Sequence, residues 1–91
     1  MKVHKIKLNI EFCDAVLNGE KTFEIRKDDR CYQNGDRIKF IPTTSGSCFP
    51  IGYETVWHPV ADREYEITFV LHGWGLEEGY AALAIKEVKN D

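Results

Sequence analysis

The stretch Gly19-Glu20-Lys21-Thr22-Phe23-Glu24-Ile25-Arg26 places a helix stop directly before an alternating strand. Glycine adopts the left-handed backbone conformation that commonly follows the last turn of a helix, so Gly19 marks the end of the preceding element. From Phe23 onward apolar and charged residues alternate, which is the period-two pattern of a β-strand. The sequence therefore predicts a helix that leads into a strand, with Glu24 and Arg26 on the same strand face.

Upstream of this stretch the sequence predicts one strand and one helix. Residues 3–8 alternate in period two, with Ile6 and Leu8 expected to face the interior. Residues 9–18 carry apolar side chains at helical spacing, and Asn9 is a residue type that caps helix N-termini.

Downstream of Gly19, short alternating segments predict strands at residues 20–27, 37–41, 63–72 and 80–88. Within the third of these, Tyr65 and Phe69 are expected in the core. Residues 42–62 are rich in Pro, Gly, Ser and Thr and are predicted to form a long loop. Many short strands with a single helix favour an α+β fold, a small and mainly antiparallel β-barrel of five or six strands.

Length and composition predict one soluble domain that spans residues 1–91. The chain has a mass of 10.5 kDa, with 43% hydrophobic and 30% charged residues. A chain of this size buries one core. No apolar run approaches the roughly 20 residues that cross a bilayer, and the first residues lack the apolar segment of a signal peptide. We therefore expect a cytoplasmic protein that does not enter membranes.

Charge is distributed unevenly along the chain. The net charge is −3, from 12 Lys and Arg against 15 Asp and Glu, which excludes a generic polycation for nucleic acid. Residues 1–41 hold 9 basic and 7 acidic residues, whereas residues 42–91 hold 3 basic and 8 acidic residues. A local basic site is therefore expected in the first half of the chain.

The cysteines and histidines give no sign of a metal site or of a thiol nucleophile. Cys13, Cys31 and Cys48 are odd in number and form no CxxC pair, so we expect free thiols and neither metal nor cofactor. The three histidines stand alone in the sequence, and we expect structural or solvated roles for them: His4, His58 and His72.

The pattern G-x-K-x-x-E-x-R in residues 19–26 resembles the signature of the ASCH superfamily, whose fold is a PUA-like β-barrel. Residues 24–30, then Gly35-Asp36 and Gly79-Tyr80, are similar to a small ASCH-related family of bacterial and phage proteins. The resemblance implies an association with RNA. It also implies that the signature residues line a cleft between the helix and the barrel. In this sequence those residues are Lys21, Glu24 and Arg26.

These residues favour a module that binds RNA or another nucleotide-containing ligand. A carboxylate beside a guanidinium reads a base edge or holds a sugar hydroxyl and a phosphate. Gly19 permits close approach of the backbone to a ligand, and exposed aromatic side chains in the long loop are candidates for base stacking. The predicted ligand-binding residues are Gly19, Lys21, Glu24, Arg26, Lys27, Arg30, Tyr53 and Trp57.

Two alternatives stand beside the binding module. One is a small metal-independent amidohydrolase that acts on a modified nucleoside, with Lys21 and Glu24 as acid and base and the loop 42–62 as a lid. Some ASCH members resemble hydrolases of acylated cytidine that use a Lys and a Thr, but Glu24 occupies the place of that Thr. The other alternative is a protein-interaction domain. The lack of a Ser, Thr or Cys nucleophile beside a His favours binding over catalysis.

Overall fold

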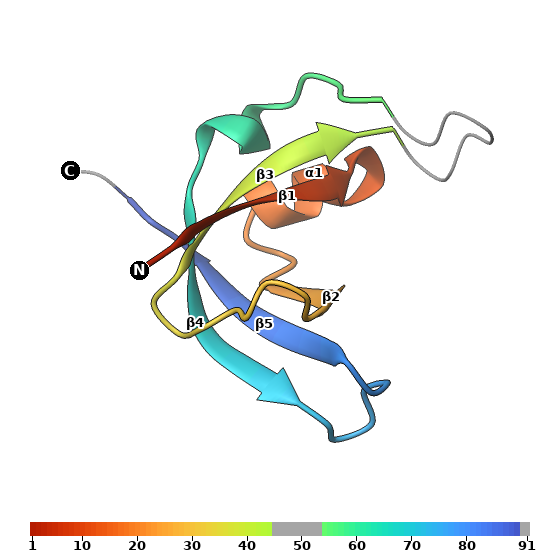
Figure 1. Cartoon of the computed structure of the whole chain (residues 1–91). Helices are drawn as coiled ribbons and strands as arrows, with labels where there is room; N and C mark the ends of the chain where they lie inside the picture. Colours follow the sequence, from red (N-terminus) through yellow and green to blue (C-terminus); the bar gives the residue numbers. More distant parts are fainter. Residues whose placement is uncertain (45–53, 90–91) are drawn as a thin grey trace.

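A computed structural model describes residues 1–44 and 54–89 of the chain. It contains one α-helix, one short 3₁₀-helix and five strands (Figure 1). In chain order the elements are β1 (Val3–Asn9), α1 (Ile10–Leu17), β2 (Phe23–Lys27), β3 (Arg37–Thr43), η1 (Pro59–Asp62), β4 (Tyr65–His72) and β5 (Tyr80–Glu87).

The five strands form one mixed sheet in the order β1-β3-β4-β5-β2. The β1–β3 pair is parallel, and the other three pairs are antiparallel. The predicted α+β class, with five strands and one main helix, is confirmed. The sheet is strongly bent (Figure 1), but β1 and β2 stay at its two edges and no ladder joins them in the described part of the chain. Strand pairing therefore does not close the sheet into a barrel.

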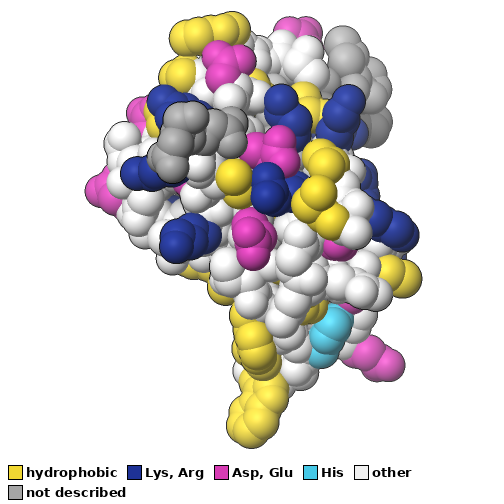
Figure 2. Space-filling view, turned by 90° about the vertical axis from the view of Figure 1, so that its left-hand side faces the viewer, with side chains coloured by type: hydrophobic (Ala, Val, Ile, Leu, Met, Phe, Trp, Pro, Cys, Tyr) yellow, Lys and Arg dark blue, Asp and Glu magenta, His cyan; other side chains and the backbone are white. Residues whose placement is uncertain are grey.

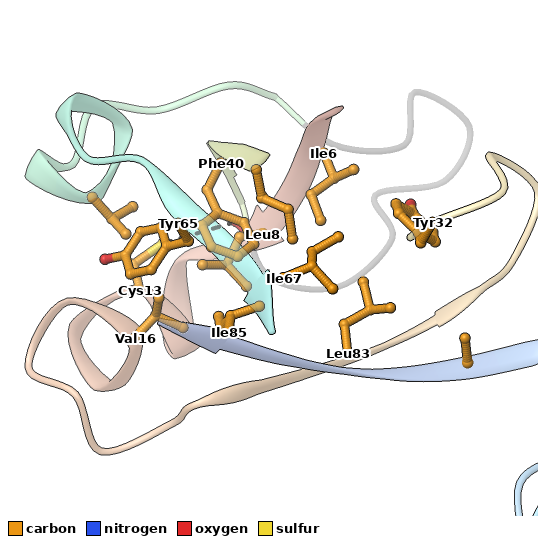
Figure 3. Packing of buried hydrophobic residues seen from close by; sticks show 13 residues of the cluster. Ile6, Leu8, Cys13, Val16, Tyr32, Phe40, Tyr65, Ile67, Leu83 and Ile85 are labelled. Carbon is orange, nitrogen blue, oxygen red and sulfur yellow. Dashed lines mark hydrogen bonds between the residues drawn. The ribbon is translucent and has the colours of Figure 1, made fainter. Parts of the chain in front are cut away.

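The core lies inside the bend of the sheet, with α1 and η1 packed at one end (Figure 3). Ile6 and Leu8 of β1 face inward, as predicted, at 1% and 3% exposure. The rings of Phe40 and Tyr65 meet edge to face with their centroids 5.4 Å apart. Each large apolar side chain that is fully buried contributes about 1.5–3 kcal/mol.

The junction between α1 and β2 is tighter than the sequence predicted. Gly19 has φ +77°, and the backbone amides of Glu20 and Lys21 both donate to the carbonyl oxygen of Ala15. These hydrogen bonds turn residues 20–22 back toward the helix, so β2 begins at Phe23 and not at residue 20. At the other end of α1, Asn9 is the N-cap residue as predicted, but its side chain makes no capping hydrogen bond.

A β-bulge in β4 overturns the prediction that Phe69 is a core residue. Ile67 pairs with Ile85 and Phe69 pairs with Ala84, so Thr68 is an extra residue in the ladder. An extra residue reverses the face on which the following side chains lie. Tyr65 is buried as predicted, whereas Phe69 is 56% exposed.

The turn between β4 and β5 projects away from the rest of the molecule. In Figure 2 this hairpin is the narrow lower part, and hydrophobic side chains cover its tip, whereas basic and acidic side chains are interspersed above it. Trp74 in this turn is 88% exposed.

A buried polar pair anchors the start of β1 to the turn before β3. His4 Nε2 lies 2.8 Å from Asp36 Oδ2, and the backbone amides of Lys2 and Gln33 also donate to this carboxylate. Burial raises the pKa of Asp36, but the hydrogen bonds from His4 and the two amides outweigh it, and the net shift is downward. The pair confirms a structural role for His4.

We expect Asp36→Asn to lower the free energy of unfolding at neutral pH by about 2 kcal/mol, since the charged acceptor is lost. Because folding lowers the pKa of Asp36, its contribution is complete above the unfolded-chain value of 3.8 and is lost as the pH falls below it. Urea titrations at a series of pH values check this. Asp29→Asn, at an exposed carboxylate, is the control, and a wild-type advantage over Asp36→Asn that persists undiminished at about pH 2 would contradict the account.

Candidate functional site

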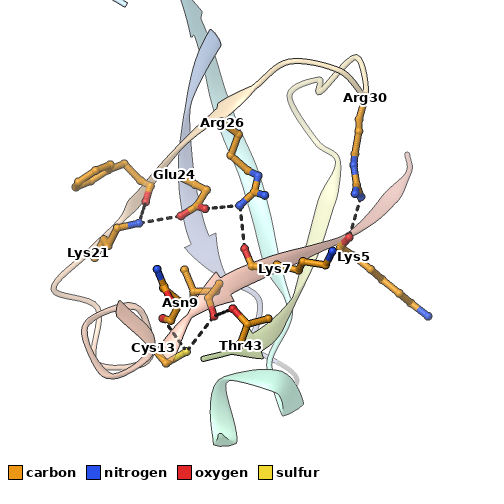
Figure 4. A network of polar contacts seen from close by, with 11 residues as sticks. Lys5, Lys7, Asn9, Cys13, Lys21, Glu24, Arg26, Arg30 and Thr43 are labelled. Atoms are coloured by element: carbon orange, nitrogen blue, oxygen red, sulfur yellow. Dashed lines mark hydrogen bonds and ion pairs between the residues drawn. The ribbon is translucent and has the colours of Figure 1, made fainter. Parts of the chain in front are cut away.

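A buried carboxylate held between two cations is the centre of the candidate site (Figure 4). Glu24 Oε1 lies 2.8 Å from Lys21 Nζ, and Glu24 Oε2 lies 2.8 Å from an Arg26 guanidinium nitrogen. The Glu24 side chain is only 8% exposed, against 17% for Lys21 and 28% for Arg26. Two cations around one carboxylate leave this cluster with a net positive charge that is partly open to solvent.

Strand β2 turns its charged face inward and its apolar face outward. Glu24 is buried, whereas Phe23 and Ile25 are 48% and 53% exposed. Burial of an unpaired carboxylate is very costly, so Glu24 stays inside only because Lys21 and Arg26 pair with it. The predicted shared face of Glu24 and Arg26 is confirmed, and their side chains are in direct contact.

Two arginines, one on β2 and one in the segment that follows it, reach the opposite edge strand β1. Arg26 donates a 2.9 Å hydrogen bond to the Lys7 carbonyl oxygen, and Arg30 donates a 2.7 Å hydrogen bond to the Lys5 carbonyl oxygen. Both acceptors lie on β1, at the opposite edge of the sheet from β2 (Figure 4). We call this junction, with residues Lys5, Lys7, Lys21, Glu24, Arg26 and Arg30, the β1–β2 seam.

Two exposed aromatic rings flank the ammonium group of Lys21. Its Nζ lies 4.8 Å from the centroid of the Phe23 ring and 5.6 Å from that of the Phe12 ring, within the range of cation–π attraction. Lys21 also donates a 2.7 Å hydrogen bond to the Phe23 carbonyl oxygen. Phe12 and Phe23 were not among the predicted ligand-binding residues, because apolar side chains within a helix or a strand are ordinarily interpreted as packing residues.

The structure treats the other four predicted ligand-binding residues differently. Gly19 shapes the turn that returns Lys21 to β2. Lys27 is exposed at the end of β2. Trp57 is 80% exposed, but no contact among the described residues joins it to the β1–β2 seam; Tyr53 lies outside the residues that the structure describes.

The remaining two histidines form hydrogen bonds with aspartate side chains. His58 Nε2 lies 2.7 Å from Asp14 Oδ1, and its Nδ1 accepts the amide hydrogen of Val60 at the start of η1. His72 lies 2.7 Å from Asp28 Oδ2, and this hydrogen bond is the main reason that the pKa of Asp28 lies below its usual value.

The described residues contain neither a cluster of metal-ligating side chains nor a helix that could cross a membrane. No group of three or more His, Cys, Asp or Glu side chains within residues 1–44 and 54–89 is placed to hold a metal ion. In the same ranges no helix has the length and apolar character to span a bilayer. Cys13 is buried and Cys31 is exposed, both as free thiols; Cys48 lies outside these ranges.

Residues 3–85 match the family model described as "Domain of unknown function (DUF3850)". The chain belongs to this family. A 37-residue segment is 46% identical to the "Uncharacterized 12.9 kDa protein in GpA 3'region" of Escherichia phage P2, and it covers 41% of this chain and 34% of the phage protein. The match thus spans about a third of the length of that curated relative.

We expect Glu24→Gln to lower the free energy of unfolding by about 1–3 kcal/mol, because it leaves Lys21 and Arg26 without their shared counter-charge. Urea denaturation measures the change. Glu20→Gln, at an exposed glutamate, is the matched control and should change stability by less than about 0.5 kcal/mol. Equal effects of the two substitutions would show that the Glu24 carboxylate does not hold the seam together.

Proposed function

We propose that this DUF3850 protein binds single-stranded RNA, or a nucleotide-containing ligand, at the β1–β2 seam. The observation that carries the proposal is the buried Glu24 carboxylate, held at 2.8 Å by both Lys21 and Arg26 on the inward face of an edge strand. Burial of such a cluster offers the fold no apolar gain. Its partly exposed cations are instead fixed in position and ready to contact an anion.

The cations of the seam are suited to phosphate groups. Lys5, Lys7 and Arg30 are exposed, and Arg30 is oriented by a neutral carbonyl rather than by a carboxylate. A guanidinium that donates one hydrogen bond retains further donors for a phosphate. This arrangement accounts for the basic bias of the first 41 residues in a protein of net charge −3.

Base contacts are proposed for the two rings beside Lys21. Phe12 and Phe23 are 42% and 48% exposed, and exposed aromatic rings next to cations are the common stacking surface for unpaired bases. These rings lie on regular elements, α1 and β2, so their positions are set before the ligand arrives. A preformed surface lowers the cost of ordering on binding.

The resemblance of residues 19–26 to the ASCH signature supports an RNA-related role. It also supports a finer description of the fold as a PUA-like barrel. In that description the side chains of Arg26 and Arg30 complete the junction between β1 and β2 that a strand ladder would otherwise make.

The hydrolase alternative rests on the Lys21–Glu24 pair alone. Both oxygens of Glu24 are engaged by cations, and Lys21 already donates to Glu24 and to the Phe23 carbonyl oxygen. Catalysis by this pair would require the substrate to displace one of these contacts. Binding uses the pair as it stands, so binding is the function that the geometry favours.

We expect Arg26→Ala and Arg30→Ala each to weaken binding of a fluorescein-labelled single-stranded RNA by about 1–2 kcal/mol, because each removes a charged contact to phosphate. Fluorescence anisotropy at low salt measures the affinity, and log K should fall with log salt by about 0.7 per phosphate contact. Arg63→Ala is the matched control, since Arg63 pairs with Glu87 and has no part in the seam.

The same samples test the alternatives. RNA binding that is absent at low salt, or that responds equally to Arg26→Ala and Arg63→Ala, would overturn the proposal. Incubation with acylated cytidines in chelator, followed by chromatography, tests hydrolysis. Turnover that is lost in Lys21→Ala and Glu24→Gln would replace binding by catalysis as the function of the seam.

A further inference from the structure

A small pocket adjoins the β1–β2 seam at the end of α1. Its volume is about 280 Å³, and its lining includes Leu17, Gly19, Lys21, Tyr65 and Lys86. Drug-sized ligands occupy pockets of roughly 300–1,000 Å³, so this one suits a single nucleotide and not a longer chain. Lys21 belongs both to this pocket and to the seam.

Tyr65 lines this pocket, and its buried hydroxyl group has no hydrogen-bond partner among the described residues. Tyr65 as a whole is only 3% exposed. Figure 3 shows its ring packed in the core, with its hydroxyl at the end of the cluster where Cys13 and Val16 of α1 lie. An unsatisfied buried hydroxyl costs about 1–3 kcal/mol, and nearly all buried polar groups have partners. A ligand that accepts its hydrogen bond would remove this cost.

The chemistry of the lining indicates a ligand with a flat apolar body and a negative charge. Val16, Leu17 and Ile85 supply the apolar wall. Lys21, Lys86 and Lys89 supply three cations, and Glu87 is the acidic residue of the lining. A nucleobase that carries a phosphate has both properties and also supplies a hydrogen-bond acceptor for the hydroxyl, because the base packs on the apolar wall and the phosphate pairs with the lysines.

We propose that this pocket holds one nucleotide, with the Tyr65 hydroxyl donating to an acceptor atom of the base and Lys86 or Lys89 paired with the phosphate. The proposal rests on the proposed function, and it makes the pocket the place where one base of the bound strand is selected. Lys21 belongs to both the seam and the pocket, because it pairs with the Glu24 carboxylate and also lines the pocket.

The protonation state of Tyr65 fits this role. Burial, with a smaller contribution from Glu87, raises the pKa of Tyr65 to about 12. The hydroxyl therefore keeps its proton at neutral pH and donates it to a base nitrogen or carbonyl oxygen.

The substitution Tyr65→Phe tests the proposal, because it removes one buried oxygen and keeps the ring. Isothermal titration with AMP, CMP, GMP and UMP in turn should identify the nucleotide that the wild-type protein binds best. We expect Tyr65→Phe to weaken the binding of that nucleotide about tenfold, which is the loss of affinity that corresponds to one hydrogen bond. The ligand-free variant should melt at the same temperature as the wild-type protein or higher, since it no longer buries an unsatisfied hydroxyl.

Two outcomes would overturn the proposal. One is a wild-type protein that binds none of the four nucleotides at millimolar concentration, and the other is equal affinity in the wild-type protein and in Tyr65→Phe. Arg26→Ala, measured with the longer RNA, separates this from the proposed function. If Arg26→Ala weakens RNA binding while Tyr65→Phe leaves mononucleotide binding unchanged, the seam binds RNA and the pocket does not select a base.

Discussion

The pairing of Glu24 with Lys21 and Arg26 is the interaction on which the rest of this structure depends. A carboxylate removed from water is tolerated only when its charge is matched, so Lys21 must fold back from the turn after α1 and Arg26 must lie flat on the strand. Arg26, so placed, reaches the Lys7 carbonyl oxygen and holds β2 against β1. One buried charge thus fixes the helix-to-strand turn, the inward face of β2 and the junction of the two sheet edges.

The sequence showed which residues share a strand face but not which face is buried. Alternation alone would bury Phe23 and Ile25, because apolar side chains normally form the core. The opposite arrangement occurs because β2 is an edge strand whose inner face meets cations and carbonyl oxygens instead of a second apolar layer. Phe69 was misplaced for a different reason: the bulge at Thr68 depends on pairing with β5, and single-strand periodicity does not record pairing.

The candidate site could be predicted only in part. The spacing of residues 19–26, and their resemblance to the ASCH signature, predicted Lys21, Glu24 and Arg26 as site residues. The role of Arg30 depends on β1 lying across from it, which is a long-range contact. The sequence predicted stacking aromatic residues in the long loop, yet the rings that contact Lys21 are Phe12 and Phe23, which lie on a helix and a strand. Apolar residues within a helix or a strand are ordinarily interpreted as packing residues, so neither ring stood out in the sequence.

A titration of the ¹⁵N-labelled protein with a short single-stranded RNA most directly tests the proposal that RNA binds where β1 meets β2. We expect amide shift changes concentrated at residues 5–7, 12 and 21–30, with few changes at residues 59–64 around η1. Shift changes centred on η1 or on the β4–β5 turn, or none at low salt, would contradict it.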